Sequence, residues 1–157
     1  MEQLLIRKYP DPILMKKAEK IKDPLAKDIQ ELISGMFETL RADSRGVGLA
    51  APQVGFSLRL FVIELEGIPY VLINPKITAK SRKKITGEEG CLSFPGQFLP
   101  VSRYDRIQMR YTDQYGKPGK IKTQGLLARA LQHELDHLDG ILFIDRVKSS
   151  DKPKTKK

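Results

Sequence analysis

The sequence predicts a single α+β domain of short antiparallel strands packed around a central helix, with a further helix near the N-terminus. Three observations support this fold class. The chain has 157 residues, which suits one core. Two segments show helical apolar periodicity, and the short runs between them are rich in β-branched and aromatic residues. No repeat or boundary divides residues 1–147, which are expected to form the domain; the lysine-rich residues 148–157 are expected to be a disordered tail.

The first helix is expected at about residues 24–42. Asp23-Pro24 favours a helix start, because aspartate can cap a helix and proline suits the first helical position. Apolar residues then recur at helical spacing: Leu25, Ile29, Leu32, Ile33, Met36, Phe37 and Leu40. One face of this helix is therefore expected to be buried, and Gly46 lies just beyond its end.

Four segments are expected as strands from their composition and partial alternation: Leu58–Leu65, Tyr70–Ala79, Val101–Asp113 and Lys120–Thr123. Glu66–Pro69 separates the first two and favours a hairpin or a strand–loop–strand unit. Tyr115–Gly119 forms a turn between the last two. Pro75 limits how centrally the second strand can lie in a sheet, because proline cannot donate to the ladder.

The second helix is expected to run from about Gly125 to Leu138. Its apolar positions are Leu126, Leu127, Ala130, Leu131, Leu135 and Leu138. Gly140 is a natural stop, and a short apolar stretch, Ile141–Ile144, follows it.

Composition is that of an ordinary globular protein, with 40% apolar and 30% charged residues. No apolar run is long enough to cross a bilayer, and the N-terminus lacks the apolar core of a secretory signal. One cysteine cannot form an internal disulfide. With no signal or transit peptide seen, the expected location is the cytoplasm.

The chain has a net charge of +9, of which residues 148–157 contribute +4 through five lysines and one aspartate. This balance fits a protein that works near polyanions, although solubility alone explains it about as well. The chain has no tryptophan, and no basic stripe is interleaved with aromatic residues. Nucleic-acid recognition is therefore only weakly suggested, and neither DNA nor a membrane is an expected partner.

The two histidines of the chain, His133 and His137, are four residues apart in the second helix. This spacing places both imidazoles on one side of a helix, where they can coordinate one metal ion while Glu134 accepts and donates protons. The alternative is a pair of surface histidines matched by chance. Metal binding is favoured, because the pair lies in an amphipathic helix, encloses a glutamate and uses every histidine.

The third ligand decides the chemistry of such a site. In zinc proteases with this motif it is commonly a downstream Glu or His, but the chain has no glutamate after Glu134 and no histidine after His137. Cys91 is the remaining candidate, although an arbitrary cysteine is more often a buried apolar residue. Its segment, Gly87–Gly96, is polar and glycine-bounded and does not resemble a core strand. A thiolate and two imidazoles can hold zinc, iron(II), nickel or cobalt.

A third block, Gly46–Gly55, is dominated by small residues. It lacks the pattern of a phosphate-binding loop, but its small residues would let an extended peptide lie close to the backbone. Gln53 could then donate to a developing oxyanion. Taken alone, a close-packed turn explains this block better.

The three blocks together resemble the signature blocks of the peptide deformylase family, in the family's order and at compatible spacings. They are Gly46-Val47-Gly48-Leu49-Ala50-Ala51-Pro52-Gln53, Glu89-Gly90-Cys91-Leu92-Ser93 and Gln132-His133-Glu134-Leu135-Asp136-His137. The resemblance spans roughly residues 4–147. It implies a cytoplasmic, monomeric hydrolase that removes the formyl group from the N-terminal formylmethionine of new polypeptides and releases formate.

The resemblance also assigns roles to residues. It implies that Cys91, His133 and His137 bind one divalent metal ion per chain, Fe(2+) in the cell, with Zn(2+), Ni(2+) or Co(2+) able to replace it. Glu134 would be the general acid and base, and Gln53 and the backbone N–H of Leu92 would face the carbonyl oxygen. The substrate backbone would be held by Gly46, Val47 and Gly48 on one side and by Glu89 and Gly90 on the other.

The methionine side chain needs an apolar slot beside the ion. Leu126 and Ala130 lie on roughly the same helical face as His133 and are the candidates for it. Arg129 shares this face, but it is interpreted as an arginine that reaches solvent or pairs with backbone. Many bacterial members continue into a long C-terminal helix that helps docking on the ribosome. Here only the short tail follows, so ribosome contact would have to be electrostatic.

Two other functions are compatible with parts of the sequence. A structural zinc domain that binds nucleic acid would fit the charge, but such a site usually has four protein ligands, and no fourth Cys or His exists. A deformylase-like protein that acts on another acyl group, or that is inactive, is the second alternative. The sequence does not decide the acyl preference, although every residue needed for activity is present.

Overall fold

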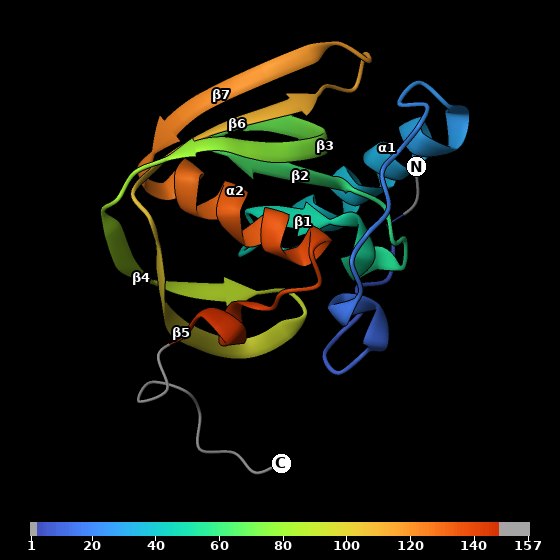
Figure 1. Ribbon diagram of the computed structural model, residues 1–157. Coiled ribbons are helices and arrows are strands. Elements are labelled where there is room, and N and C mark those ends of the chain that lie inside the picture. The colour runs from blue at the N-terminus through green and yellow to red at the C-terminus, as the bar shows by residue number, and fades with distance from the viewer. Residues whose placement is uncertain (1–2, 148–157) are drawn as a thin grey trace.

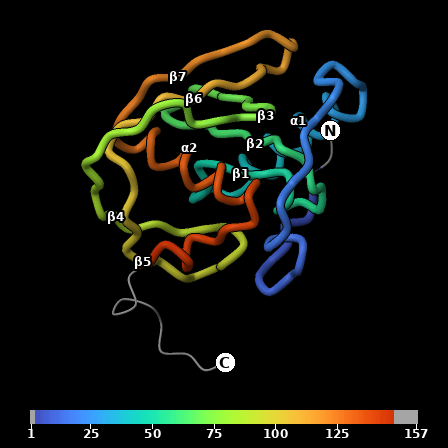
Figure 2. The backbone as a smooth tube through the Cα atoms, in the orientation of Figure 1, coloured from blue at the N-terminus to red at the C-terminus, as the bar shows by residue number. Residues whose placement is uncertain are grey.

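The structure is a computed structural model and describes residues 3–147; the predicted tail, 148–157, lies outside the described residues. Its α+β architecture confirms the predicted fold class. A five-stranded antiparallel sheet has the order β1-β2-β3-β6-β7, and a two-stranded antiparallel sheet is formed by β4 and β5. Helix α2 runs between the two sheets (Figure 1, Figure 2), and α1 lies beside the larger sheet.

The elements have the following bounds. The strands are β1 Gly48–Ala50, β2 Leu60–Leu65, β3 Ile68–Lys80, β4 Lys84–Cys91, β5 Phe94–Tyr104, β6 Arg106–Thr112 and β7 Pro118–Gln124. The α-helices are α1 Lys27–Arg41 and α2 Gly125–Leu138, and three short 3₁₀ helices are η1 Pro12–Met15, η2 Ala51–Val54 and η3 Phe143–Arg146. In the described part of the chain, no helix has both the length and the apolarity to span a membrane.

Helix α1 begins three residues later than predicted. Asp23 does not cap it: the aspartate side chain accepts a hydrogen bond from the Leu25 amide and stabilises a turn before the helix. Leu25 was expected on the buried face but lies in that turn and is 60% exposed. Helix α2, by contrast, has the predicted bounds, because its limits are set by local residues that include Gly125 with a φ of +72°.

The prediction of one strand over Val101–Asp113 is wrong. The chain bends at Asp105, so that β5 ends at Tyr104 and β6 begins at Arg106. These two strands belong to different sheets, because β5 pairs with β4 whereas β6 pairs with β3 and β7. The change of sheet depends on these distant partners, which local composition does not reveal.

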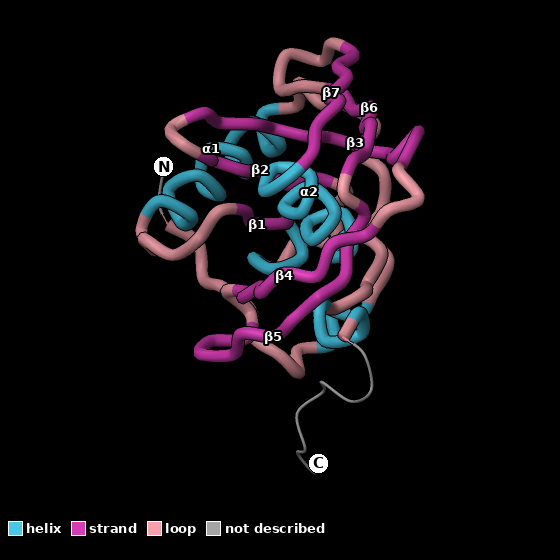
Figure 3. Tube along the Cα trace, turned by 90° about the vertical axis from the view of Figure 1, so that its left-hand side faces the viewer, coloured by secondary structure: helices cyan, strands magenta, loops and turns pink. Residues whose placement is uncertain are grey.

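The segment around Cys91 is a β-hairpin, which the sequence did not predict. β4 and β5 lie side by side as a ribbon on the far side of α2 from the large sheet (Figure 3). Most side chains of β4 are exposed, so it lacks the apolar alternation by which a strand is recognised in a sequence. Cys91 is the last residue of β4 and faces the helix.

Three buried clusters hold α2 in place. The apolar face of α1 packs on one face of the sheet against residues such as Leu60, Val62 and Ile73. The opposite face of the sheet packs against α2 through Phe61, Met109 and Leu131 among others. A smaller cluster lies between the β4–β5 hairpin and η3, and its members are Leu14, Phe94, Val101, Leu142, Phe143 and Val147. The helix that carries the histidines is therefore enclosed on both sides.

Candidate metal centre

The two histidines of α2 are buried on the same side of the helix. His133 is 8% exposed and His137 is 1% exposed, and their ring centroids are 5.1 Å apart. Helix α2 is tied to β5 by Gln132, whose side-chain oxygen accepts from the Tyr104 amide and whose nitrogen donates to the Tyr104 carbonyl, at 3.0 and 2.9 Å. This double contact fixes the helix relative to the hairpin that carries Cys91.

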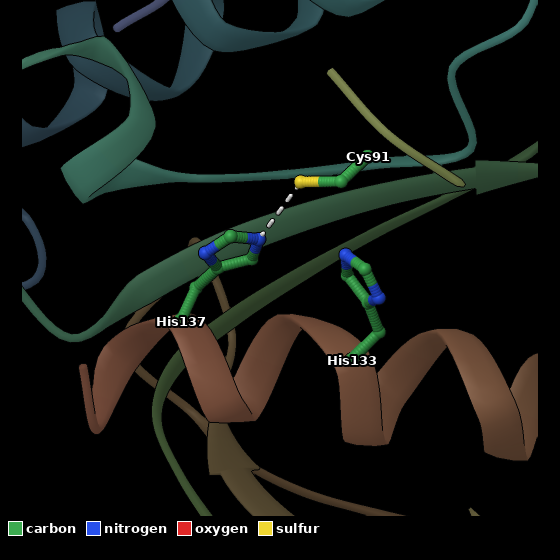
Figure 4. A group of neighbouring side chains, drawn as sticks. All are labelled: Cys91, His133 and His137. Carbon is green, nitrogen blue, oxygen red and sulfur yellow. Dashed lines mark hydrogen bonds between the residues drawn. The ribbon is translucent and has the colours of Figure 1, made fainter. Parts of the chain in front are cut away.

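Cys91 completes the ligand set that the sequence predicted. Its Sγ lies 3.4 Å from Nε2 of His137 (Figure 4), and the candidate ligand atoms of Cys91, His133 and His137 all lie within 4.8 Å of one another. One thiolate and two imidazoles converging in this way can bind a divalent transition metal and leave a position open for water or substrate. These three residues form the metal site.

Glu134 lies beside this group and supports the presence of an ion there. The residue is 4% exposed, and its Oε1 has no hydrogen-bond partner among the described residues. Burial raises the pKa of this carboxyl to about 7, against the lowering effect of the His133 charge. Buried polar atoms rarely lack partners, so an unpartnered carboxylate oxygen next to three ligand atoms fits a site that takes a metal ion and water.

Glu89 orients the first histidine. Its Oε1 pairs with Nδ1 of His133 at 2.8 Å, and its carboxylate accepts from Nε and Nη2 of Arg103, both at 2.9 Å. Burial favours the neutral acid, but hydrogen bonds from Arg103 and His133 outweigh it and hold the pKa of Glu89 well below its usual range. The carboxylate thus leaves Nε2 of His133 free for the metal, as outer partners of metal ligands commonly do.

The same carboxylate begins a buried charge network that the sequence did not predict. Arg103 also donates to Asp136 at 2.6 Å, and Arg146 donates to the other oxygen of Asp136 at 2.9 Å. Arg103 is 4% exposed. Its position two residues after the buried Val101, on the same face of β5, was the one available signal that this arginine points inward.

Gln53 is fixed close to the thiol. Its side-chain oxygen accepts from the Ala50 amide at 2.9 Å, and its Nε2 donates to Ser93 Oγ at 3.1 Å and lies 3.6 Å from Cys91 Sγ. The residue is 1% exposed and belongs to η2, which follows the edge strand β1. Its amide group is therefore held in one orientation at the metal site.

A cavity of about 530 Å³ opens beside the metal site. Its lining includes nearly all of the predicted site residues: Gly46, Val47, Gly48, Gln53, Glu89, Gly90, Cys91, Leu92, Leu126, Ala130, His133 and Glu134. His137 is not part of this lining. The glycine-rich block and the hairpin thus form two walls of one cleft, with α2 as its floor.

Two predicted residues, Glu89 and Leu126, differ from their simplest expectation. The side chain of Glu89 is engaged inside the protein, so only its main chain can meet a substrate. Leu126 is 59% exposed and therefore stands at the rim of the cavity and not in a closed slot. Arg129 pairs with backbone as interpreted, since it donates to the carbonyls of Val101 and Ile85 at 2.9 and 2.6 Å. It also donates to Oε2 of Glu89 at 2.6 Å, an ion pair that the sequence did not predict.

Gly48→Ala is expected to lower kcat by about 100-fold without removing the metal ligands. A β-carbon at this position would lie 2.7 Å from Oε2 of Glu134, so the carboxylate must move, and displacements of this size can cost about two orders of magnitude. Steady-state kinetics with a metal assay measures this. Gly67→Ala is the control for general destabilisation by a glycine substitution: its φ of +78° strains alanine, but a β-carbon there meets no atom within 4 Å. Equal losses in the two variants would contradict the steric argument.

Comparison with known proteins gives the family. Residues 3–153 match the family model described as polypeptide deformylase. A peptide deformylase of Endomicrobium trichonymphae is 51% identical over 92% of this chain and 86% of its own length, and one of Thermodesulfovibrio yellowstonii is 49% identical over 94% and 90%. The crystal structure of the Thermotoga maritima peptide deformylase superposes with a TM-score of 0.91 at 39% identity, covering 94% of this chain and 99% of that one.

A second solved structure shows a similar degree of likeness. The peptide deformylase of Ehrlichia chaffeensis, described in complex with actinonin, superposes with a TM-score of 0.89 at 41% identity and covers 96% of this chain and 91% of its own. Sequence, fold and the Cys91–His133–His137 metal site agree with one another. The chain belongs to the peptide deformylase family and is an enzyme that removes the N-formyl group from nascent peptides.

Proposed function

We propose that deformylation takes place in the 530 Å³ cavity, with Cys91, His133 and His137 as metal ligands and Glu134 as general acid and base. One observation carries this assignment. An unpartnered, buried Glu134 oxygen lies next to a Cys-His-His cluster at the wall of an open cavity. Such a combination has no evident structural use, because an unsatisfied buried carboxylate costs stability.

Glu134 handles the protons of the reaction. A metal bound by the three ligands supplies Lewis-acid chemistry, which makes water more acidic and polarises a carbonyl group. Glu134 accepts the proton of the attacking water and then passes it to the departing methionine amine. Its burial beside the metal site supports this role. From there the carboxylate can reach the oxygen of the attacking water and the nitrogen of the departing amine without a large movement.

Gln53 and Leu92 stabilise the negative charge that grows on the formyl oxygen. Gln53 and Leu92 both line the cavity, and the hydrogen bonds of Gln53 to Ala50 and Ser93 support its role as a fixed donor. Donors fixed in advance stabilise a transition state without reorganisation, and each is typically worth about 2.7–4 kcal/mol.

The walls of the cleft hold the substrate. The backbones of Gly46, Val47 and Gly48 on one side and of Glu89 and Gly90 on the other receive the extended peptide. The methionine side chain lies against Ala130, with Leu126 covering it at the rim. Small residues at Gly48 and Gly90 support this arrangement, since side chains there would meet Glu134 and Phe98.

We infer that the metal in the cell is Fe(2+), one ion per chain, and that Zn(2+), Ni(2+) or Co(2+) can occupy the same site. A thiolate with two imidazoles accepts all four ions. Protein purified without oxygen is expected to contain iron and to lose activity in air, because thiolate-bound iron(II) is oxidised easily. Metal analysis before and after exposure to air tests this. Zinc in anaerobically prepared protein, with activity stable in air, would contradict it.

We also propose a monomeric enzyme in the cytoplasm that contacts the ribosome transiently through its basic tail. The tail carries five lysines: Lys148, Lys152, Lys154, Lys156 and Lys157. Replacing all five with glutamine is expected to weaken ribosome binding and to flatten its dependence on salt. Co-sedimentation at several salt concentrations measures both. Unchanged affinity and an unchanged salt slope would exclude ribosome contact through the tail. Light scattering tests the monomeric state, and cell fractionation tests the cytoplasmic location.

A further inference from the structure

Half of the outer face of the large sheet is not covered by a helix. Helix α1 packs over β1, β2 and the first part of β3, whereas β6 and β7 lie beyond it (Figure 1). On these strands Ile107, Met109 and Ile121 point toward α2. The residues that alternate with them therefore point outward into solvent.

These outward positions are basic. We define the basic sheet face by five exposed residues of β3, β6 and β7: Lys76, Arg106, Arg110, Lys120 and Lys122. The three strands carry no aspartate or glutamate. Within residues 3–147, none of the five makes an ion pair.

The register stacks like charges directly across the sheet. Lys76 on β3 is paired with Arg110 on β6, and Arg110 is paired with Lys120 on β7. Paired residues share one face with their β-carbons roughly 5 Å apart, and like charges at this distance destabilise a sheet. Three cations thus lie in a row about 10 Å long on strands that carry no acidic residue. Solubility alone does not require this placement, because dispersed charges would serve it without the repulsion.

A ligand that relieves the repulsion must be an extended anion, because the face is a sheet surface and not a pocket. A membrane surface fits poorly, since the one exposed large hydrophobic residue on the three strands, Ile68, is the first residue of β3, eight residues before Lys76, and anchoring in lipid needs apolar contacts. The remaining neighbours on the face, including Thr78 and Gln108, are hydrogen-bonding groups of the kind that contact phosphate and sugar. We propose that the basic sheet face binds the phosphate backbone of RNA.

This contact lies on another face of the enzyme than the cleft and does not depend on the metal assignment. Nascent peptides emerge next to RNA, so an RNA contact would keep the enzyme near its substrate. Because the five residues that define the basic sheet face offer only positive charges, RNA binding is expected to show no base preference and to depend strongly on salt.

The first test compares two full-length triple variants with equal loss of charge. One is Lys76→Gln, Arg110→Gln, Lys120→Gln; the control is Lys16→Gln, Lys17→Gln, Lys20→Gln, at exposed positions after η1. Binding of a labelled 20-nucleotide single-stranded RNA is measured by fluorescence anisotropy from about 0.05 to 0.4 M salt. Each phosphate contact contributes about 0.7 to the slope of log affinity against log salt, so the face variant is expected to lose about 2.

At about 0.1 M salt the face variant is expected to bind at least 10-fold more weakly than the unchanged protein, and the control less than 3-fold more weakly. All three proteins should deformylate a short formyl-Met peptide at the same rate, which shows that they are folded. Equal losses in the two variants would overturn the proposal, as would no RNA binding by the unchanged protein at 0.05 M salt. Tighter binding to vesicles containing phosphatidylserine, without competition by RNA, would also overturn it.

A second readout depends on the repulsion itself. Arg110→Gln removes the central charge of the row, so its Tm is expected to rise by roughly 1–4 °C while RNA affinity falls. If Arg110 served only folding, its replacement would not raise the Tm while it lowers the affinity for RNA. A fall in the Tm of Arg110→Gln would contradict the proposal.

Discussion

Glu134→Ala is expected to lower kcat for deformylation by about 10²- to 10⁴-fold while the protein keeps one metal ion per chain. The metal is held by Cys91, His133 and His137, so removing the carboxylate leaves the ligand set intact. What is lost is the group that accepts a proton from water and delivers it to the amine. Steady-state kinetics on a formyl-Met peptide, together with metal analysis of the same sample, measures both quantities.

A matched control for this variant is Glu88→Ala. Glu88 also lines the cavity, but it is exposed and belongs to β4 at the rim. Its removal is expected to change kcat by no more than a few-fold, because no proton transfer depends on it. A Glu134→Ala enzyme within 10-fold of normal activity would refute the general acid–base role. Loss of the metal in that variant would show instead that Glu134 acts as a ligand.

Arg103→Met is expected to lower the free energy of unfolding by about 3–5 kcal/mol. Arg103 is buried between the carboxylates of Glu89 and Asp136, and methionine would leave Glu89 short of two hydrogen bonds in a buried position. Removing one member of a buried charge network costs far more than removing a surface charge. Urea denaturation of metal-free proteins measures the difference without a contribution from metal binding.

The control for Arg103 is Arg82→Met, at an exposed position in the loop between β3 and β4. Its effect is expected to stay within about 0.5 kcal/mol. Arg103→Met should also weaken metal binding by about 10- to 100-fold, because Glu89, with only Arg129 left to fix its carboxylate, would hold His133 less firmly. A stability change below 1 kcal/mol would mean that Glu89 and Asp136 find other partners, and the network would not have the structural role given to it here.

Elements whose limits are set by nearby residues could be predicted from the sequence, whereas elements set by distant strand partners could not. Helix α2 was predicted with its observed bounds, because its periodicity and flanking glycines are local features. The break at Asp105 was missed, since it exists only because β5 and β6 pair with strands of different sheets. Strand β4 was missed because its side chains are mostly exposed and its partner, β5, decides its conformation.

The site was predictable where chemistry limited the choices. Two histidines and one cysteine are the full stock of imidazole and thiolate in the chain, so few ligand sets were possible. Arg103 and Asp136 could not be found in this way, because their pairing joins β5 to α2 across 33 residues and charged residues are abundant. The inward turn of the Glu89 side chain likewise depends on tertiary contacts with His133 and Arg103.

The central claim is that one ion held by Cys91, His133 and His137 makes this cleft a deformylase. A stoichiometric titration tests it most directly: metal-free protein receives Fe(2+) under anaerobic conditions, and turnover of formyl-Met and acetyl-Met peptides is followed. Turnover of the formyl peptide should rise linearly, level off at one ion per chain and far exceed that of the acetyl peptide. His137→Ala should require a large excess of metal. Equal turnover of both peptides, or full activity of His137→Ala at one equivalent, would contradict the account.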